Sequence, residues 1–128
     1  MNLPELKSKH TDLNGYINVE EGLGRLRKNK KIYGQILNSF AKNTRFGELF
    51  ELLQKGDFSE AQKTAHAIKG VAANLSLTLL YELSADMEVR LKSGDTDVAS
   101  GIETLEKVID KTVEFIEIVI QNLEDIDF

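Results

Sequence analysis

Cysteine is absent from this 128-residue chain, which also has one proline and only two histidines. Without cysteine there is no disulfide framework, no thiolate nucleophile and no Cys-based zinc or iron–sulfur site. The sequence is therefore compatible with a reducing, intracellular compartment. Hydrophobic residues make up 41% of the chain, which is enough to build the core of one compact domain without covalent cross-links.

Long apolar runs and an excess of positive charge are also missing. Sixteen Lys and Arg stand against 21 Asp and Glu, for a net charge of −5, which disfavours nucleic acid and anionic membrane surfaces as partners. The apolar runs fall far short of the roughly 20 residues of a membrane span. The polar start, which includes Pro4, does not resemble a secretory leader. We expect a soluble, cytoplasmic domain with no nucleic acid and no membrane as partner.

Hydrophobic residues recur at intervals of three and four rather than two, which indicates an all-α protein. We expect a loosely ordered N-terminal segment over residues 1–16 and a helical domain over residues 17–128. The periodicity predicts a short helix and then four longer amphipathic ones, at residues 17–28, 30–55, 58–74, 77–92 and 98–123. The second stretch loses phase near residues 43–45, which predicts a kink or break. Short connections favour an antiparallel four-helix bundle with a short additional N-terminal helix.

Turn residues mark both ends of the helix predicted at residues 58–74. Gly56 suits the left-handed position after a helix end. Asp57, with Glu60 three residues later, suits the N-cap of the helix that follows. At the other end, Ser76 offers an N-cap for the helix predicted at residues 77–92.

The helix predicted at residues 58–74 has an unusual polar face. On a wheel of about 100° per residue, its apolar residues lie opposite His66, which therefore faces solvent. Within about 60° of the histidine lie Ser59, Gln62, Lys63, Lys69, Gly70 and Ala73. A mid-helix glycine costs about 0.5–1 kcal/mol relative to alanine. Gly70, one turn from the histidine, thus indicates that another molecule comes close at this place.

An exposed imidazole beside an ammonium group suits reversible capture of a phosphoryl group. A neutral imidazole nitrogen is a nucleophile toward phosphorus, and Lys69 can neutralise phosphoryl oxygens one turn away. Other chemistries lack their residues. His10, the second histidine, forms no H-E-x-x-H metal motif, and no G-x-x-x-x-G-K-[ST] loop is present for a nucleotide. We expect this chain to bind no metal and no cofactor of its own.

The run AHAIKGVAANL at residues 65–75 resembles the signature of histidine-containing phosphotransfer (HPt) domains, the four-helix modules of two-component phosphorelays. The likeness extends over most of residues 17–123. It implies that His66 is the phosphoacceptor, that Lys69 stabilises the phosphoryl group, and that Gly70 leaves clearance for an incoming receiver domain.

The same likeness bears on residues outside the motif core. The family tends to carry a Glu or Gln on the next helix that hydrogen-bonds the histidine and orients it, and by spacing this position matches Glu88. Many members have glycine where this chain has Ser76, which leaves the shape of that turn open. We expect Gln62, Lys63 and Ala73 to contact the partner together with Gly70.

The resemblance implies a phosphoryl carrier, not an enzyme with its own ATP-binding or hydrolytic site. Its partners would be response-regulator receiver domains and a histidine kinase, with Mg²⁺ held by the receiver. Two alternatives remain open from the sequence. One is a helical adaptor that binds a receiver or kinase without carrying phosphate, and the other is the phosphoacceptor module of a larger kinase.

Overall fold

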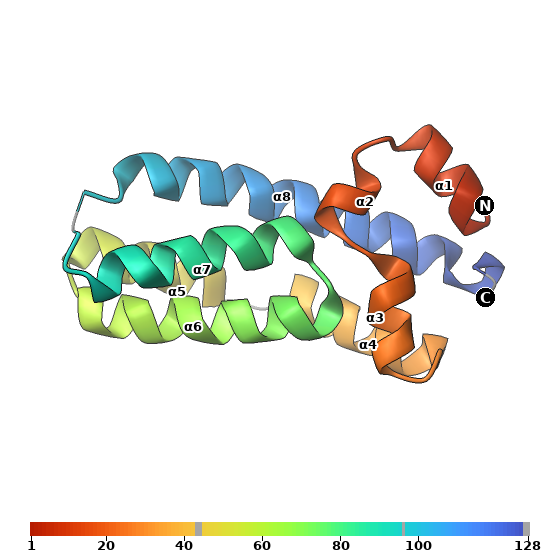
Figure 1. The fold of residues 1–128 in the computed structure, drawn as a ribbon, viewed down its shortest axis with the longest axis horizontal. Helices are drawn as coiled ribbons and strands as arrows, with labels where there is room; N and C mark the ends of the chain where they lie inside the picture. The colour runs from red at the N-terminus through yellow and green to blue at the C-terminus, as the bar shows by residue number, and fades with distance from the viewer. Residues whose placement is uncertain (43–44, 96, 127–128) are drawn as a thin grey trace.

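A computed structural model describes residues 1–42, 45–95 and 97–126, and the described residues contain helices and no strand. Figure 1 shows the helices in chain order. They are α1 (Leu3–Lys9), α2 (Leu13–Tyr16), α3 (Val19–Arg25), α4 (Lys30–Ala41), α5 (Arg45–Lys55), α6 (Phe58–Leu75), α7 (Thr78–Lys92) and α8 (Ala99–Asn122), followed by the 3-10 turn η1 (Leu123–Asp125).

The long helices pack as a bundle, which confirms the predicted all-α fold. The helices α6 and α7 form an antiparallel hairpin, and α8 packs against α7 (Figure 1). Two helices together take the place of the fourth helix of the bundle: α5 packs against α6, and α4 packs against α8. The stretch predicted as one helix at residues 30–55 is therefore two helices. Residues 43–44, at the predicted break, lie outside the described residues.

The N-terminal segment differs from its prediction as a loosely ordered stretch. Asn2 and Glu5 form a reciprocal capping box at the start of α1, and the terminal amine bonds Asn122 Oδ1 at 2.8 Å. Three leucines of this segment are buried in the common core: Leu3, Leu6 and Leu13. Such helices are too short to be stable alone, so they form because they pack on the bundle. Local periodicity in the sequence does not reveal this packing. The domain boundary placed at residue 17 stays a prediction.

The start of α6 follows the predicted turn chemistry. Gly56 has a φ of 76°, the left-handed conformation that glycine adopts without strain. The Asp57 side chain accepts a hydrogen bond from the Glu60 backbone N–H. This cap fixes where α6 begins and therefore which of its faces carries each residue.

The α6–α7 corner corrects the prediction for Ser76, which is not the N-cap of α7. Ser76 ends α6 in the left-handed conformation (φ 57°, ψ 41°), and Leu77 precedes α7 without a capping side-chain bond. The Ser76 hydroxyl donates to Glu21 Oε1 at 2.9 Å and accepts from Arg25. Its hydroxyl is therefore used to hold α3 against the corner, where a glycine would fit the backbone but make neither bond.

A buried tyrosine ties α4 to the same corner. Tyr33 is completely buried, and its hydroxyl donates to the Leu75 carbonyl oxygen at 3.0 Å. Its ring passes so close to Gly22 of α3 that the glycine has no room for a side chain. Burial raises the pKa of Tyr33 above its ordinary value, so the hydroxyl remains a neutral donor. Helices α3 and α4 thus brace the end of α6 that follows the histidine.

Candidate functional site

Helix α6 combines a core face of small residues with an exposed histidine. Ala61, Ala65 and Ala72 are fully buried, and their short side chains allow α7 to pack closely. On the opposite face the His66 side chain is 67% exposed. The close α6–α7 approach brings side chains of α7 within reach of this imidazole.

Glu88 of α7 holds one nitrogen of the His66 ring. The His66 Nδ1 atom lies 2.8 Å from Glu88 Oε1, and the glutamate side chain is only 12% exposed. An ionised carboxylate can only accept, so Nδ1 carries the proton and donates it to the bond. In the neutral ring, Nε2 then carries the free lone pair. The contact places a nucleophilic nitrogen on an exposed, oriented ring.

Lys69 shares the same carboxylate. Its Nζ atom lies 2.7 Å from Glu88 Oε2, and its side chain is 27% exposed. The hydrogen bond from Lys69, then that from His66, hold the pKa of Glu88 below its ordinary value, against the opposing effect of burial. The sequence predicted Lys69 to serve a phosphoryl group but did not predict this pair. In the free protein one carboxylate thus binds both His66 and Lys69.

Replacing Glu88 by Gln tests this carboxylate through pH. Because its folded pKa is lowered, Glu88 stabilises the fold fully above its ordinary pKa of 4.5, and this contribution disappears as pH falls through the lowered value. We expect Glu88→Gln to lower the free energy of unfolding by about 1–2 kcal/mol at pH 7. The difference in free energy of unfolding between this variant and wild type should disappear at acidic pH. Urea unfolding across pH measures this.

A control for that experiment is Glu60→Gln, which removes an exposed carboxylate that pairs with Lys63 at 3.1 Å. Exposed pairs contribute little, so its effect should stay within about 0.5 kcal/mol at all pH values. A Glu88→Gln difference that stayed constant down to strongly acidic pH would contradict the assignment.

The remaining predicted site residues differ in how exposed they are. Gly70 is exposed, and a side chain added there would meet no atom within 4 Å. Gln62 and Ala73 are half-buried, whereas Lys63 is exposed and paired with Glu60. Ala73 lines a hollow with Ser76 and Tyr81 at the corner end of the helix. The space outside Gly70 is therefore open, as its predicted clearance requires.

Sequence reasoning missed two exposed apolar residues beside the site. Tyr81 is 42% exposed and Val89 is 64% exposed, and both lie on α7, the helix that carries Glu88. They are eight residues apart with Ala85 midway, so the three lie on one side of α7. The spacing of four residues was the sequence signal for this exposed stripe. The core stripe of α7 repeats with a similar period and obscured it.

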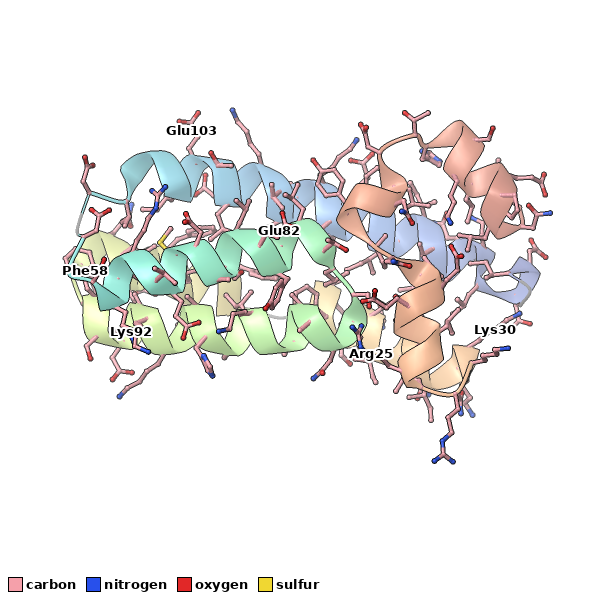
Figure 2. The ribbon with its side chains drawn as sticks, in the orientation of Figure 1. Arg25, Lys30, Phe58, Glu82, Lys92 and Glu103 are labelled. Atoms are coloured by element: carbon pink, nitrogen blue, oxygen red, sulfur yellow. The ribbon has the colours of Figure 1, made fainter. Side chains whose placement is uncertain are left out.

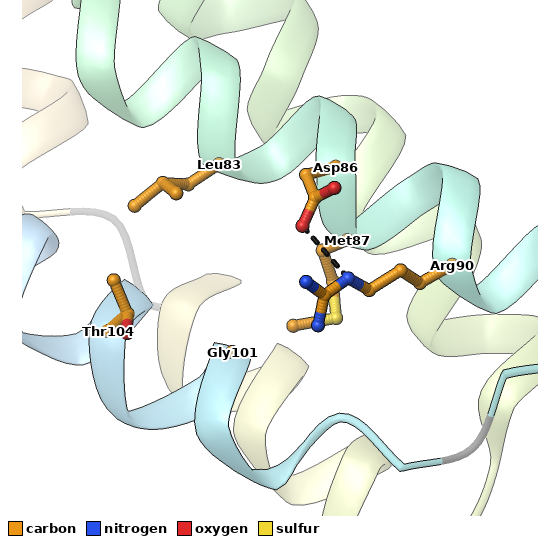
Figure 3. Close-up of a pocket in the computed structure, with 6 residues that line it drawn as sticks. All are labelled: Leu83, Asp86, Met87, Arg90, Gly101 and Thr104. Carbon is orange, nitrogen blue, oxygen red and sulfur yellow. Dashed lines mark ion pairs between the residues drawn. The ribbon is translucent and has the colours of Figure 1, made fainter.

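A second hollow lies on the other side of α7, toward α8 (Figure 3). There Asp86 and Arg90 form an ion pair at 3.0 Å, and Gly101 lies close to Met87. The hollow contains no predicted site residue. Elsewhere in the described part of the chain, no group of three or more His, Asp or Glu side chains could hold a metal ion, and no helix among those residues has the length and apolarity to cross a bilayer.

Comparison with known proteins places this site in a family. The family model of the Hpt domain matches residues 42–125, which is more than half of the chain and includes His66, Lys69 and Glu88. No curated protein and no solved structure matches the chain. The matched span covers α5 to α8, the helices that build and support the exposed imidazole. The chain therefore belongs to the Hpt domain family and has a phosphotransfer role in two-component signalling.

Proposed function

We propose that His66 accepts a phosphoryl group on Nε2, from a receiver-domain phospho-aspartate or from a histidine kinase, and passes it to the aspartate of a response-regulator receiver. The observation that carries this proposal is the bond between His66 Nδ1 and Glu88 Oε1 at 2.8 Å. It fixes the proton on Nδ1 and leaves the Nε2 lone pair on a ring that is 67% exposed. A partner can reach this nitrogen without any change in the fold.

Every group that this chain contributes to the transfer is already present at the site. The Nε2 lone pair attacks phosphorus, the bond from phosphorus to the aspartyl oxygen breaks, and the receiver's carboxylate leaves. The same steps in the reverse direction transfer the phosphoryl group from Nε2 to the aspartate of a second receiver. Mg²⁺ and most of the charge stabilisation come from the receiver, so this chain contributes position and charge as a carrier and not as an enzyme.

The proposal is tested by incubating the protein with phosphorylated receiver domains. We expect the label to move to this chain as a phosphoramidate, which is labile in acid and stable in alkali, and then to pass to a second receiver. An adaptor that only binds would retain receivers without acquiring label. Absence of label with every receiver and kinase that binds the protein would refute the carrier function.

Lys69 is expected to stabilise the transferred phosphoryl group by leaving Glu88 for a phosphoryl oxygen. We expect Lys69→Ala to slow transfer about ten- to a hundredfold, because one fixed positive charge is lost from the transition state. Rapid-quench measurement of label transfer gives the rate. The matched control is Lys55→Ala, since Lys55 lies on α5 outside the predicted site, is 65% exposed and is bonded to Glu51. Equal rates for the two variants would contradict this role.

Gly70 is expected to act through clearance and not through stability. A methyl group at Gly70 meets nothing within 4 Å, so Gly70→Ala should raise the free energy of unfolding by about 0.5–1 kcal/mol. The same methyl group should raise the KM for a receiver, because the partner's backbone can no longer approach. Gly47→Ala is the control, since Gly47 of α5 is equally open and lies outside the site. A stabilised Gly70 variant with unchanged transfer kinetics would contradict this prediction.

A further inference from the structure

The connection between α3 and α4 concentrates positive charge on an otherwise acidic chain. Five of the 16 Lys and Arg lie within residues 25–31, and none of the 21 Asp and Glu does. We call these residues the basic tip: Arg25, Arg27, Lys28, Lys30 and Lys31. Lys30 is half-buried and the other four are exposed. In Figure 1 this connection lies at the end of the molecule opposite the α5–α6 turn.

Folding does not explain why cations occupy these positions. Arg27 and Lys28 have φ angles of 54° and 64°, a left-handed conformation that is unfavourable for residues with a side chain. Lys30 and Lys31 begin α4, where the helix dipole favours acidic residues, and its first turn has none. Both features work against stability, and residues that do so are characteristic of functional surfaces.

The charges of the basic tip are only partly neutralised within the molecule. Arg25 pairs with Glu21 at 2.7 Å and lies beside the α6–α7 corner (Figure 2). The Lys30 ammonium donates to the backbone carbonyl oxygen of Glu124 at 3.4 Å. Among the described residues no carboxylate forms an ion pair with Arg27 or Lys31. The tip therefore presents positive potential to solvent, reinforced by the N-terminal end of α4.

An apolar hollow adjoins the basic tip. It lies between α3, α4 and α6 and is lined by Arg25, Leu26, Ile36, Val71, Asn74 and Leu75. Ile32 and Ile36 on the neighbouring turns of α4 are 43% and 38% exposed. Arg25 belongs to both features, so a ligand that enters the hollow also meets the positive charge.

We propose that the basic tip and this hollow form a second docking contact for the receiver, which takes an acidic segment carrying one apolar side chain. The inference rests on the proposed function. Asn74, at the hollow, is eight residues beyond His66 on α6, or about 12 Å along the helix axis. A standard interface of about 800 Å² per partner is roughly 30 Å across, so one receiver seated on His66 extends far enough along α6 to reach Asn74 at the edge of the hollow.

The shape of the surface favours a protein over other polyanions. A concave hollow can enclose a single protruding side chain of a protein. A membrane surface is flat and contacts residues that project from a protein, not residues that line a hollow. Nucleic acid would need an extended basic track, and the basic tip spans only residues 25–31. The net charge of −5 also opposes long polyanions while leaving a local contact with acidic residues favourable.

The test uses the double variant Arg27→Glu/Lys31→Glu. Each protein is phosphorylated on His66 with phosphoramidate, a small donor that needs no docking surface, and is then discharged by a panel of purified receiver domains. We expect the variant to lower kcat/KM for discharge at least tenfold at low ionic strength, with kcat unchanged and the difference shrinking as salt is added. Phosphoramidate loading should equal that of wild type.

The control is Lys9→Glu/Lys107→Glu, which changes net charge equally at exposed positions of α1 and α8, and its kcat/KM should stay within twofold of wild type. Circular dichroism checks that both double variants fold. Discharge of the basic-tip variant at the control's rate by every competent receiver would overturn the inference while leaving the proposed function intact. Tip-dependent binding of wild type to phosphatidylglycerol vesicles or duplex DNA, with discharge unaffected, would assign the tip to that ligand instead. Failure of every receiver to discharge the wild type would refute both proposals.

Discussion

A His66→Gln variant is expected to take up no phosphoryl group. Glutamine has no basic nitrogen and cannot form the covalent bond to phosphorus, so the loss should reach the detection limit, at least a thousandfold. Transfer of label from a phosphorylated receiver, resolved by electrophoresis under alkaline conditions, measures it directly. Uptake at the wild-type rate would remove His66 as the acceptor and with it the proposed function.

The same variant should fold like wild type, which separates chemistry from stability. The His66 side chain is 67% exposed and belongs to no part of the core, and substitutions at such positions change the free energy of unfolding by about 0.5 kcal/mol or less. Glutamine retains an amide N–H that can reach the Glu88 carboxylate. A matched control is His10→Gln, because His10 is the second histidine and lies on the edge of Phe115, remote in sequence from the site. Only the His66 variant should lose uptake.

Replacing Gly22 by alanine is expected to cause the largest loss of stability. A methyl group at Gly22 would lie 2.5 Å from the Tyr33 hydroxyl oxygen and 2.8 Å from two ring carbons. Tyr33 is completely buried and bonded to the Leu75 carbonyl oxygen at 3.0 Å, so it has nowhere to move. Overpacking of this kind costs about 1–3 kcal/mol, and loss of the tyrosine bond adds about 1 kcal/mol. We expect Gly22→Ala to destabilise the domain by about 2–4 kcal/mol in urea unfolding.

Gly24 provides a control in the same helix. A side chain at Gly24 meets nothing within 4 Å, so Gly24→Ala should stabilise α3 by about 0.5–1 kcal/mol through helix propensity. The two glycines are two residues apart and differ only in what surrounds them. Combining Gly22→Ala with Tyr33→Phe should cost less than the sum of the two single changes, because the nearest clashing atom is removed. Strict additivity would show that the Tyr33 hydroxyl is not the cause of the clash.

His66 and Gly22 serve different parts of one mechanism. His66 provides the chemistry, whereas Gly22 and Tyr33 hold α3 and α4 against the end of α6 that follows it. A destabilised Gly22 variant that remains folded should still accept phosphoryl groups from a small donor. Its discharge by receivers should weaken if the α3–α4 connection contacts the partner. The variant therefore offers a second, independent view of the docking surface.

The sequence predicted the features that depend on periodicity within one helix. The 3.6-residue repeat and the cap at Asp57 placed α6 at nearly its observed limits and set His66 opposite the buried Ala65 and Ala72. These are local properties, because each residue's direction follows from its position along one helix axis. Glu88 was found by family likeness, since periodicity alone placed it only at the border of the apolar stripe of its helix.

The tertiary structure decided which residues of different helices meet. The register between α6 and α7, set by the packing of small and large core side chains, brings Lys69 as well as His66 to Glu88. Burial of leucines on the bundle orders the segment before residue 17, and contacts with α3 hold Ser76 in a left-handed corner. Contacts between elements depend on the packing of side chains far apart in the sequence, and no single-helix pattern specifies that packing. The sequence alone therefore determined the helices and the outward histidine, whereas the structure decided its partners.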